Sequence, residues 1–408
     1  MKKSILLMLS VALVLFAGCK KHQWRPTAGE QIRFQAVTES ASSSTKTVYS
    51  GEYYDTSIEH IDWVEGDKIS VAYVSYNVSG DGPVDMVGLS DDYVISGIKP
   101  FDRTTNPSAR SKAELTPANG NGLVWQDRQY HGFFGTYPDL TGDLDFRFGV
   151  DDSKGVIYHV PFHFPAEQFP VSSGDSTLKL TSGSEISCVR YNPDMQYAYM
   201  TAFAKDFVTL DDPVVNLNFK TEYIAYEFSA DMAGVDPNDD EEELTVNSFT
   251  LTDAAGNLVG DFMLRTKEEA TADDPEDERL PVANASPAVS FFFNEDKDPI
   301  TITEGTPIVF TVFTGIDWTR FISTPNRSTQ LTITFNIVDK NGDNVNRSLK
   351  LQDNNGNWIS FDQWDSSSRD NQGIKHRIYG LKIPLELKNE PNGWFESPSA
   401  GGYTNQDW

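Results

Sequence analysis

Cysteine is nearly absent, because the 408-residue chain contains only Cys19 and Cys188. A framework of several disulfides is therefore excluded. Cys-x-x-Cys pairs, which would indicate a zinc site or a thiol redox centre, do not occur either. The fold must consequently depend on its hydrophobic core.

Catalytic signatures are also missing from the sequence. The chain has no Gly-x-Ser-x-Gly elbow, no His-Glu-x-x-His pair and no Walker phosphate loop. We therefore predict no catalytic residue, no metal and no cofactor, and expect a protein that is not an enzyme. Paired carboxylates of a glycoside hydrolase have no sequence signature, so a β-sandwich hydrolase is the least favoured alternative.

Positive charge is scarce. Lys and Arg number 33 against 60 Asp and Glu, which gives a formal net charge of −27 at pH 7. A chain with this excess of negative charge repels polyanions. Nucleic acid is accordingly excluded as a partner.

Long hydrophobic runs are missing except at the start of the chain. Lys2 and Lys3 precede an apolar stretch that leads into Ala17-Gly18-Cys19. The stretch is too short for a membrane-spanning helix and is typical of a signal peptide. Its end resembles a bacterial lipobox, although an ordinary secretory signal is the alternative. We predict a signal peptide over residues 1–18, a lipid on Cys19 and a lipidated tether over residues 19–31.

Helical signals are absent, and short β-rich runs bounded by Gly, Pro, Asn or Asp recur along the whole chain. The absence of βαβ alternation favours antiparallel sandwiches, so the expected class is all-β. Length favours two to three domains, and we predict two in tandem, at residues 32–208 and 209–389, with a tail at 390–408. Turn residues predict one hairpin over residues 250–264 and a second over residues 331–351.

Three residue groups allow a functional and a structural interpretation. Cys188 with His159 or His163 is a candidate nucleophile pair, but a buried cysteine is favoured. His159 and His163 also have the spacing of a metal pair, whereas Pro161 between them favours a strand. The segment 339–343 resembles the start of a calcium loop, but its glycine position favours a hairpin turn.

Several motifs together resemble the fimbrillin family of Bacteroidales, the subunits of lipoprotein-derived pili and their minor and anchor relatives. Each motif is weak alone, and their order along the chain carries the resemblance. They are the lipobox, the Ile-x-Phe run at Ile32, Thr45–Thr47, Ile61–Ile69, Phe134–Pro138, Val160-Pro161 with Gln168, Asp194–Ala198 and Val215–Lys220.

The resemblance implies two transthyretin-like β-sandwich domains and an outer-membrane lipoprotein that is exposed on the cell surface or in a fimbrium. It also implies trimming by an Arg- or Lys-specific protease, after which a strand from a neighbouring subunit replaces the first strand. Here the candidate removable strand carries Ile32, Phe34 and Ala36. The candidate cleavage site is Lys46, which equally fits an ordinary loop charge, and Arg25 is a poorer site because Pro26 follows it.

The predicted function is thus a fimbrial subunit or pilus-associated adhesin. Its predicted partners are other pilus subunits, the outer membrane through the lipid, and surface glycans or proteins. The alternative is a monomeric glycan-binding lipoprotein, with Trp394 and Trp408 of the aromatic tail as candidate sugar-stacking residues. Stalk, tip and anchor roles all stay open.

Overall fold

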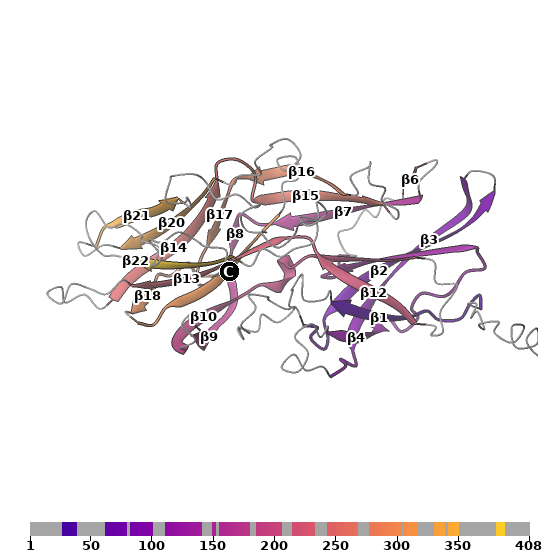
Figure 1. The fold of residues 1–408 in the computed structure, drawn as a ribbon, viewed down its shortest axis with the longest axis horizontal. Helices are drawn as coiled ribbons and strands as arrows, with labels where there is room; N and C mark the ends of the chain where they lie inside the picture. The colour runs from indigo at the N-terminus through magenta and orange to yellow at the C-terminus, as the bar shows by residue number, and fades with distance from the viewer. Residues whose placement is uncertain are drawn as a thin grey trace, which may run out of the picture.

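The computed structural model describes the chain in fourteen segments, and its elements are almost all strands, which confirms the predicted all-β class (Figure 1). The described residues are 27–38, 62–79, 82–100, 111–140, 149–151, 155–179, 185–205, 214–232, 243–267, 277–303, 305–315, 330–338, 342–350 and 381–387.

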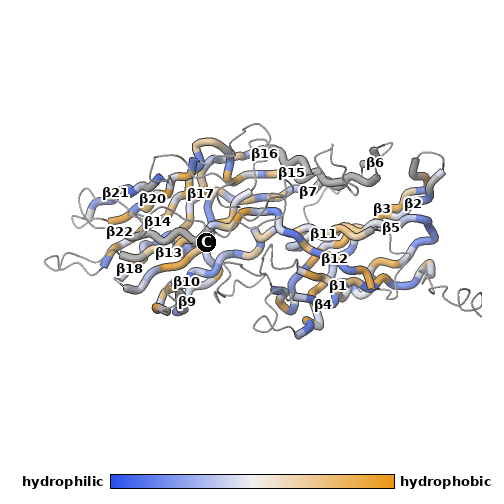
Figure 2. Tube along the Cα trace, viewed as in Figure 1, coloured by the Kyte–Doolittle hydropathy of each residue, from blue (hydrophilic) through white to orange (hydrophobic). Residues whose placement is uncertain are grey.

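Seven strands form a closed barrel, which lies on the right in Figure 1. Their order around the barrel is β1-β12-β11-β5-β2-β3-β4, and β4 pairs with β1 to close it. Buried residues alternate with more exposed ones along β4 and β12, whereas β5 is buried from its second residue to its last. Hydrophobic stretches lie along the strands of the barrel (Figure 2). The bounds are β1 (Arg33–Thr38), β2 (Lys68–Ser79), β3 (Gly82–Ser96), β4 (Lys112–Pro117), β5 (Tyr130–Tyr137), β11 (Met200–Lys205) and β12 (Val214–Thr221).

Two further sheets face each other as a sandwich, on the left in Figure 1. Phe228 and Phe310 of the first sheet pack on Phe249 of the second, tilted and edge-on, with ring centroids 4.4 and 4.8 Å away. The first sheet has the order β22-β13-β19-β10-β9, and the second has the order β21-β20-β14-β17-β8 with β18 on β14. The bounds are β8 (Glu167–Gln168), β9 (Pro170–Lys179), β10 (Glu185–Pro193), β13 (Ile224–Met232), β14 (Glu243–Asp253), β17 (Ala288–Phe291), β18 (Ile300–Thr303), β19 (Ile308–Thr314), β20 (Leu331–Val338), β21 (Asn344–Lys350) and β22 (Leu381–Leu387).

A third, four-stranded sheet has the order β16-β15-β7-β6. Its strands are β6 (Gly149–Asp151), β7 (Gly155–Phe164), β15 (Val259–Lys267) and β16 (Asp277–Ser286). Phe162 and Phe164 of β7 pack on Tyr199, which lies between the 3₁₀ turn η1 (Met195–Tyr197) and β11 of the barrel. The third sheet therefore contacts the connection that leads into the barrel.

One predicted hairpin is confirmed and the other is wrong. β20 and β21 pair antiparallel to each other, in agreement with the prediction for residues 331–351. β14 and β15 do not pair with each other, although residues 250–264 have the alternation of a hairpin. The Asp253 carboxylate accepts hydrogen bonds from the backbone N–H groups of Ala255 and Gln330, and the Leu258 N–H donates to Ser286 O. The chain thus turns a corner from the sandwich into the third sheet.

Strand pairing also crosses the predicted boundary between residues 208 and 209. β12 follows that boundary in sequence, yet it belongs to the barrel. β8, β9 and β10 precede it, yet they lie in the sandwich sheets. Among the described strands four pairs are parallel, namely β1–β12, β10–β19, β13–β22 and β17–β8. The exact division into domains stays a prediction, whereas the exchange of strands across this position is a property of the structure.

Candidate functional site

The first strand, β1, lies between two strands from distant parts of the chain. It runs parallel to β12, with Phe34 opposite Val215 and Ala36 opposite Leu217. On its other side β1 runs antiparallel to β4, which comes after β2 and β3 in the sequence. β1 therefore forms ladder pairs on both sides, and its removal would open the barrel.

The three residues predicted to mark the removable strand all lie in the barrel core. Ile32 and Phe34 are 2% and 3% exposed, and Ala36 is fully buried. The Phe34 ring meets Tyr93 and Phe133 edge-on, with centroids 5.1 and 5.3 Å apart. Arg33 between them is exposed, so the alternation read from the sequence holds from Ile32 to Ala36, after which Val37 and Thr38 are both buried.

The start of the strand is held by the segment that contains Trp125. Gly29 N–H donates to Trp125 O at 2.8 Å, and Trp125 N–H donates back to Glu30 O at 2.9 Å. Ile32 N–H donates to Leu123 O at 2.8 Å. Through these bonds the residues that precede β1 pair with residues 123–125, which follow β4 in the sequence.

The end of the strand is held by Ser111, a fully buried residue. Thr38 N–H donates to Ser111 O at 3.0 Å, and Ser111 N–H donates to Thr38 Oγ1, also at 3.0 Å. The Thr38 hydroxyl lies 3.4 Å from Ser111 O, to which it donates. Ser111 Oγ itself accepts a hydrogen bond of 3.1 Å from Trp63 N–H.

Trp63 covers this end of the barrel. Its ring meets Phe219 of β12 and Tyr137 of β5 edge-on, at centroid distances of 5.2 and 5.7 Å. Ser111 therefore binds both Thr38, which directly precedes segment 39–61, and Trp63, which lies two residues after it. No sequence signal identified Ser111, because its contacts join residues that are distant in the chain.

An aromatic cluster lies beneath the strand. Tyr73 stacks on Phe133 at 4.8 Å, and Trp125 meets His131 edge-on at 5.1 Å. His131 is buried, and its Nδ1 lies 2.6 Å from the Tyr73 hydroxyl. Burial lowers the pKa of His131 and raises that of Tyr73, because both charged forms lose solvation. The cluster is therefore uncharged at neutral pH.

The other predicted site residues lie outside the described residues. These are Cys19 with the signal peptide, Arg25, Lys46, and Trp394 and Trp408 of the tail. They stay predictions. Within the part of the chain that the structure describes, no helix has the length and hydrophobicity needed to cross a membrane.

Cys188 is a buried residue of β10, as the structural interpretation expected. It is 1% exposed, and burial raises the pKa of its thiol, which disfavours the nucleophilic thiolate. His163 lies in the third sheet and is bound to Asp261 there. The described contacts thus give no support to a Cys–His nucleophile.

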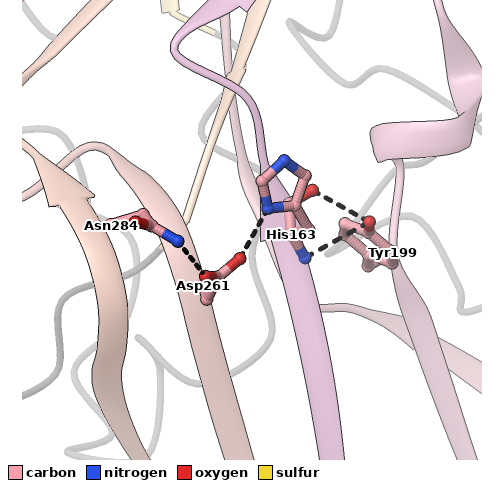
Figure 3. Close-up of polar contacts among 4 residues, drawn as sticks. All are labelled: His163, Tyr199, Asp261 and Asn284. Atoms are coloured by element: carbon pink, nitrogen blue, oxygen red, sulfur yellow. Dashed lines mark hydrogen bonds and ion pairs between the residues drawn. The ribbon is translucent and has the colours of Figure 1, made fainter. Parts of the chain in front are cut away.

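His159 and His163 both lie in β7, in agreement with the strand interpretation. His163 Nδ1 lies 2.6 Å from Asp261 Oδ1 of β15, and Asn284 Nδ2 donates to Asp261 Oδ2 at 2.9 Å (Figure 3). The backbone of His163 exchanges two hydrogen bonds with the Tyr199 hydroxyl. Among the described residues no three His, Cys, Asp or Glu side chains form a group that could hold a metal.

Comparison with known proteins gave only structural likenesses. No family model matches the chain, and no curated protein matches it. It is similar to the crystal structure of a proposed cell adhesion protein from Bacteroides uniformis, with 12% identity and a TM-score of 0.39, over 90% of this chain and 96% of that one. A second, from Parabacteroides distasonis, has 12% identity and a TM-score of 0.37, over 92% and 93%. A fimbrial assembly protein from Parabacteroides distasonis has 7% identity and a TM-score of 0.32, over 90% and 96%.

Proposed function

We propose that the protein is a non-enzymatic fimbrial subunit or pilus-associated adhesin that exchanges its strand β1 for a strand of a neighbouring subunit. The observation that carries the proposal is the position of β1. It is the first strand described in the chain, it pairs on both sides, and its inward side chains are buried. A strand in this position is part of the core, yet a single cut after it would leave it held to the barrel by non-covalent contacts alone.

The energetics favour exchange over simple loss. Burial of the Ile32, Phe34 and Val37 side chains contributes about 1.5–3 kcal/mol each, or roughly 5–9 kcal/mol together. Loss of β1 would also expose the edges of β12 and β4 that now pair with it. The unpaired backbone N–H and C=O groups of such edges readily pair with another chain. An incoming strand restores both the burial and the backbone hydrogen bonds, so main-chain pairing supplies affinity and alternate side chains supply register.

Two sequence features complete the proposal. Cys19 is the proposed lipid site, and Lys46 is the proposed cleavage site between β1 and the rest of the barrel. A cut at Lys46 would release the lipid together with β1, and the subunit would then enter the fibre. Without the cut, Cys19 would keep the subunit at the outer membrane as an anchor.

A Lys-specific protease tests this proposal. Lys46 is the only Lys or Arg between Thr38 and Trp63, so limited digestion of a chain that begins at Lys20 should give a new N-terminus at Thr47. We expect the cut chain to form oligomers once the N-terminal fragment is released, as measured by light scattering after size-exclusion chromatography. The matched control is Lys46→Ala, which should resist the cut and stay monomeric. A chain that loses the fragment and still stays monomeric would contradict strand exchange.

A further inference from the structure

The contacts around Thr38 identify a requirement for a hydroxyl side chain. Thr38 is 3% exposed, and its Oγ1 is the acceptor for the buried Ser111 N–H. Ser111 Oγ is used elsewhere, as the acceptor of the Trp63 N–H. A strand without an oxygen at this position would leave a buried amide unsatisfied, which costs more than the bond itself is worth.

The contacts around Ala36 identify a requirement for a small side chain. Ala36 is fully buried and lies in register with Leu217 on one side and Ala113 on the other. The core at this level is already filled, since a Cβ added to Gly135 would lie 3.3 Å from Leu217 Cδ1 and 2.9 Å from Phe219 Cζ. A larger side chain in place of Ala36 would therefore overpack the barrel.

The positions of Ile32 and Phe34 complete the pattern, because both are buried and Phe34 packs on Tyr93 and Phe133. We infer that the groove left by β1 selects an extended segment with a large apolar residue, an aromatic residue, a small residue and then Thr or Ser at alternate positions, running parallel to β12. This inference rests on the proposed strand exchange. It adds the chemistry by which one partner strand is accepted and another rejected.

Peptide exchange tests the rule without altering the fold of the subunit. The full chain is cut at Lys46, and a fluorescent peptide of residues 27–42 displaces the bound fragment. Unlabelled peptides then compete with it. The Thr38→Ser peptide should compete about as well as wild type. The Thr38→Val peptide, which keeps the shape and loses the oxygen, should be weaker by about tenfold or more, as expected for an unsatisfied buried amide.

Two further peptides separate packing from hydrogen bonding. The Ala36→Leu peptide should also be weaker by about tenfold or more, because overpacking costs of order 1–3 kcal/mol. The Gln35→Thr peptide is the matched control, since Gln35 lies between the inward positions and is only partly buried. Its affinity should match that of the wild-type peptide.

A Ser111→Ala subunit tests which part of residue 111 makes the selection. The preference for Thr over Val at position 38 of the peptide should persist in this variant, because the backbone of residue 111 makes the contacts.

The outcomes distinguish this rule from the proposed function. If the wild-type peptide cannot displace the fragment, strand exchange itself is wrong. If it exchanges but the Thr38→Val peptide binds equally well, the hydroxyl rule is overturned and strand exchange stands. If Ser111→Ala removes the preference for Thr, the selection acts through the Ser111 side chain, and its assignment to the backbone is overturned.

Discussion

The barrel and the sandwich both bury clusters of aromatic rings, but they draw these rings from different parts of the chain. In the sandwich, Phe310 of β19 packs against Phe228, Phe249, Phe291, Phe293 and Phe335, all from the second half of the sequence. In the barrel, Phe34 of β1 packs against Tyr93 and Phe133. Part of the barrel core thus lies on a strand that one cut would leave without a covalent link to the barrel.

This difference suggests a division of roles. The sandwich core needs no contribution from β1, so it can persist as a fixed body while the barrel changes its first strand. The barrel in turn holds β1 by specific contacts at both ends, through Trp125 and Ser111. Changes in the sandwich core should therefore act on the stability of the subunit alone, whereas changes along β1 should act on exchange as well as on stability.

The largest expected effect comes from Phe310→Ala. Loss of a buried Phe side chain at the centre of a packed cluster costs about 3–5 kcal/mol, which should lower the free energy of unfolding measured by urea denaturation. Phe34→Ala, with two ring partners in place of five, should fall near the lower end of that range, at about 3 kcal/mol. An equal or larger loss for Phe34→Ala would mean that the barrel core depends on β1 as strongly as the sandwich depends on Phe310.

Gln168→Leu should have the next largest effect, because the Gln168 amide joins the two sheets of the sandwich. Its Nε2 donates to Phe313 O at 2.6 Å, and Phe313 N–H donates to its Oε1 at 2.9 Å. Loss of both bonds leaves buried backbone groups of β19 unsatisfied, at a cost of about 1–3 kcal/mol in the free energy of unfolding.

The neighbouring Glu167→Gln variant is the control for this change. Glu167 forms an exposed ion pair with Lys297, and exposed pairs contribute about 0–1 kcal/mol. Its urea midpoint should stay close to wild type. If Gln168→Leu also keeps the wild-type midpoint, the amide does not hold the sheets together.

Local patterns in the sequence were sufficient for β1 and for the pairing of β20 with β21. Alternation at Ile32, Phe34 and Ala36 depends only on the strand's period, and the Asn-Gly turn depends only on backbone preferences. Partner choice is not local. The parallel pairing of β1 with β12 and the failure of β14 to pair with β15 depend on which distant strands share a core, and alternation is the same in either case.

The candidate site shows the same limit. The residues of the strand itself were predictable from their pattern, whereas the residues that hold it were not. Ser111 lies in a stretch with no distinctive motif, and its role arises because the fold brings Thr38 and Trp63 to its backbone and hydroxyl. The Ile61–Ile69 motif marked the region of Trp63, but its contact with β12 appears only in three dimensions.

The buried His131 should make the barrel sensitive to acid. Its pKa is lowered in the folded state by burial, so the unfolded chain binds a proton more readily. The stability present above the unfolded value of about 6.5 is therefore lost as the pH falls from that value toward the folded pKa. Urea midpoints measured from pH 8 to pH 5 should decline in the wild type, and the decline should be smaller in His131→Phe. An unchanged decline in the variant would assign the acid sensitivity to other groups.

The exposed His163 of the third sheet should produce the smallest effect, in contrast to the buried His131. The hydrogen bond from His163 is the main cause of the lowered pKa of Asp261, and the bond from Asn284 contributes less. His163→Ala should therefore raise the Asp261 pKa more than Asn284→Gly does; glycine is the matched change because Asn284 has a φ of 53°. Carbon-detected NMR titration of the Asp261 carboxyl measures the pKa shift in both variants.

Because Asp261 binds its proton less readily in the folded state, its contribution to the free energy of unfolding is present above about pH 4 and is lost as the pH falls through the folded pKa. The side chains of His163 and Asp261 are 60% and 36% exposed, so the change in unfolding free energy should stay below about 1 kcal/mol. A larger rise of the Asp261 pKa in Asn284→Gly than in His163→Ala would show that the amide, and not the imidazole, holds the carboxylate in its charged form.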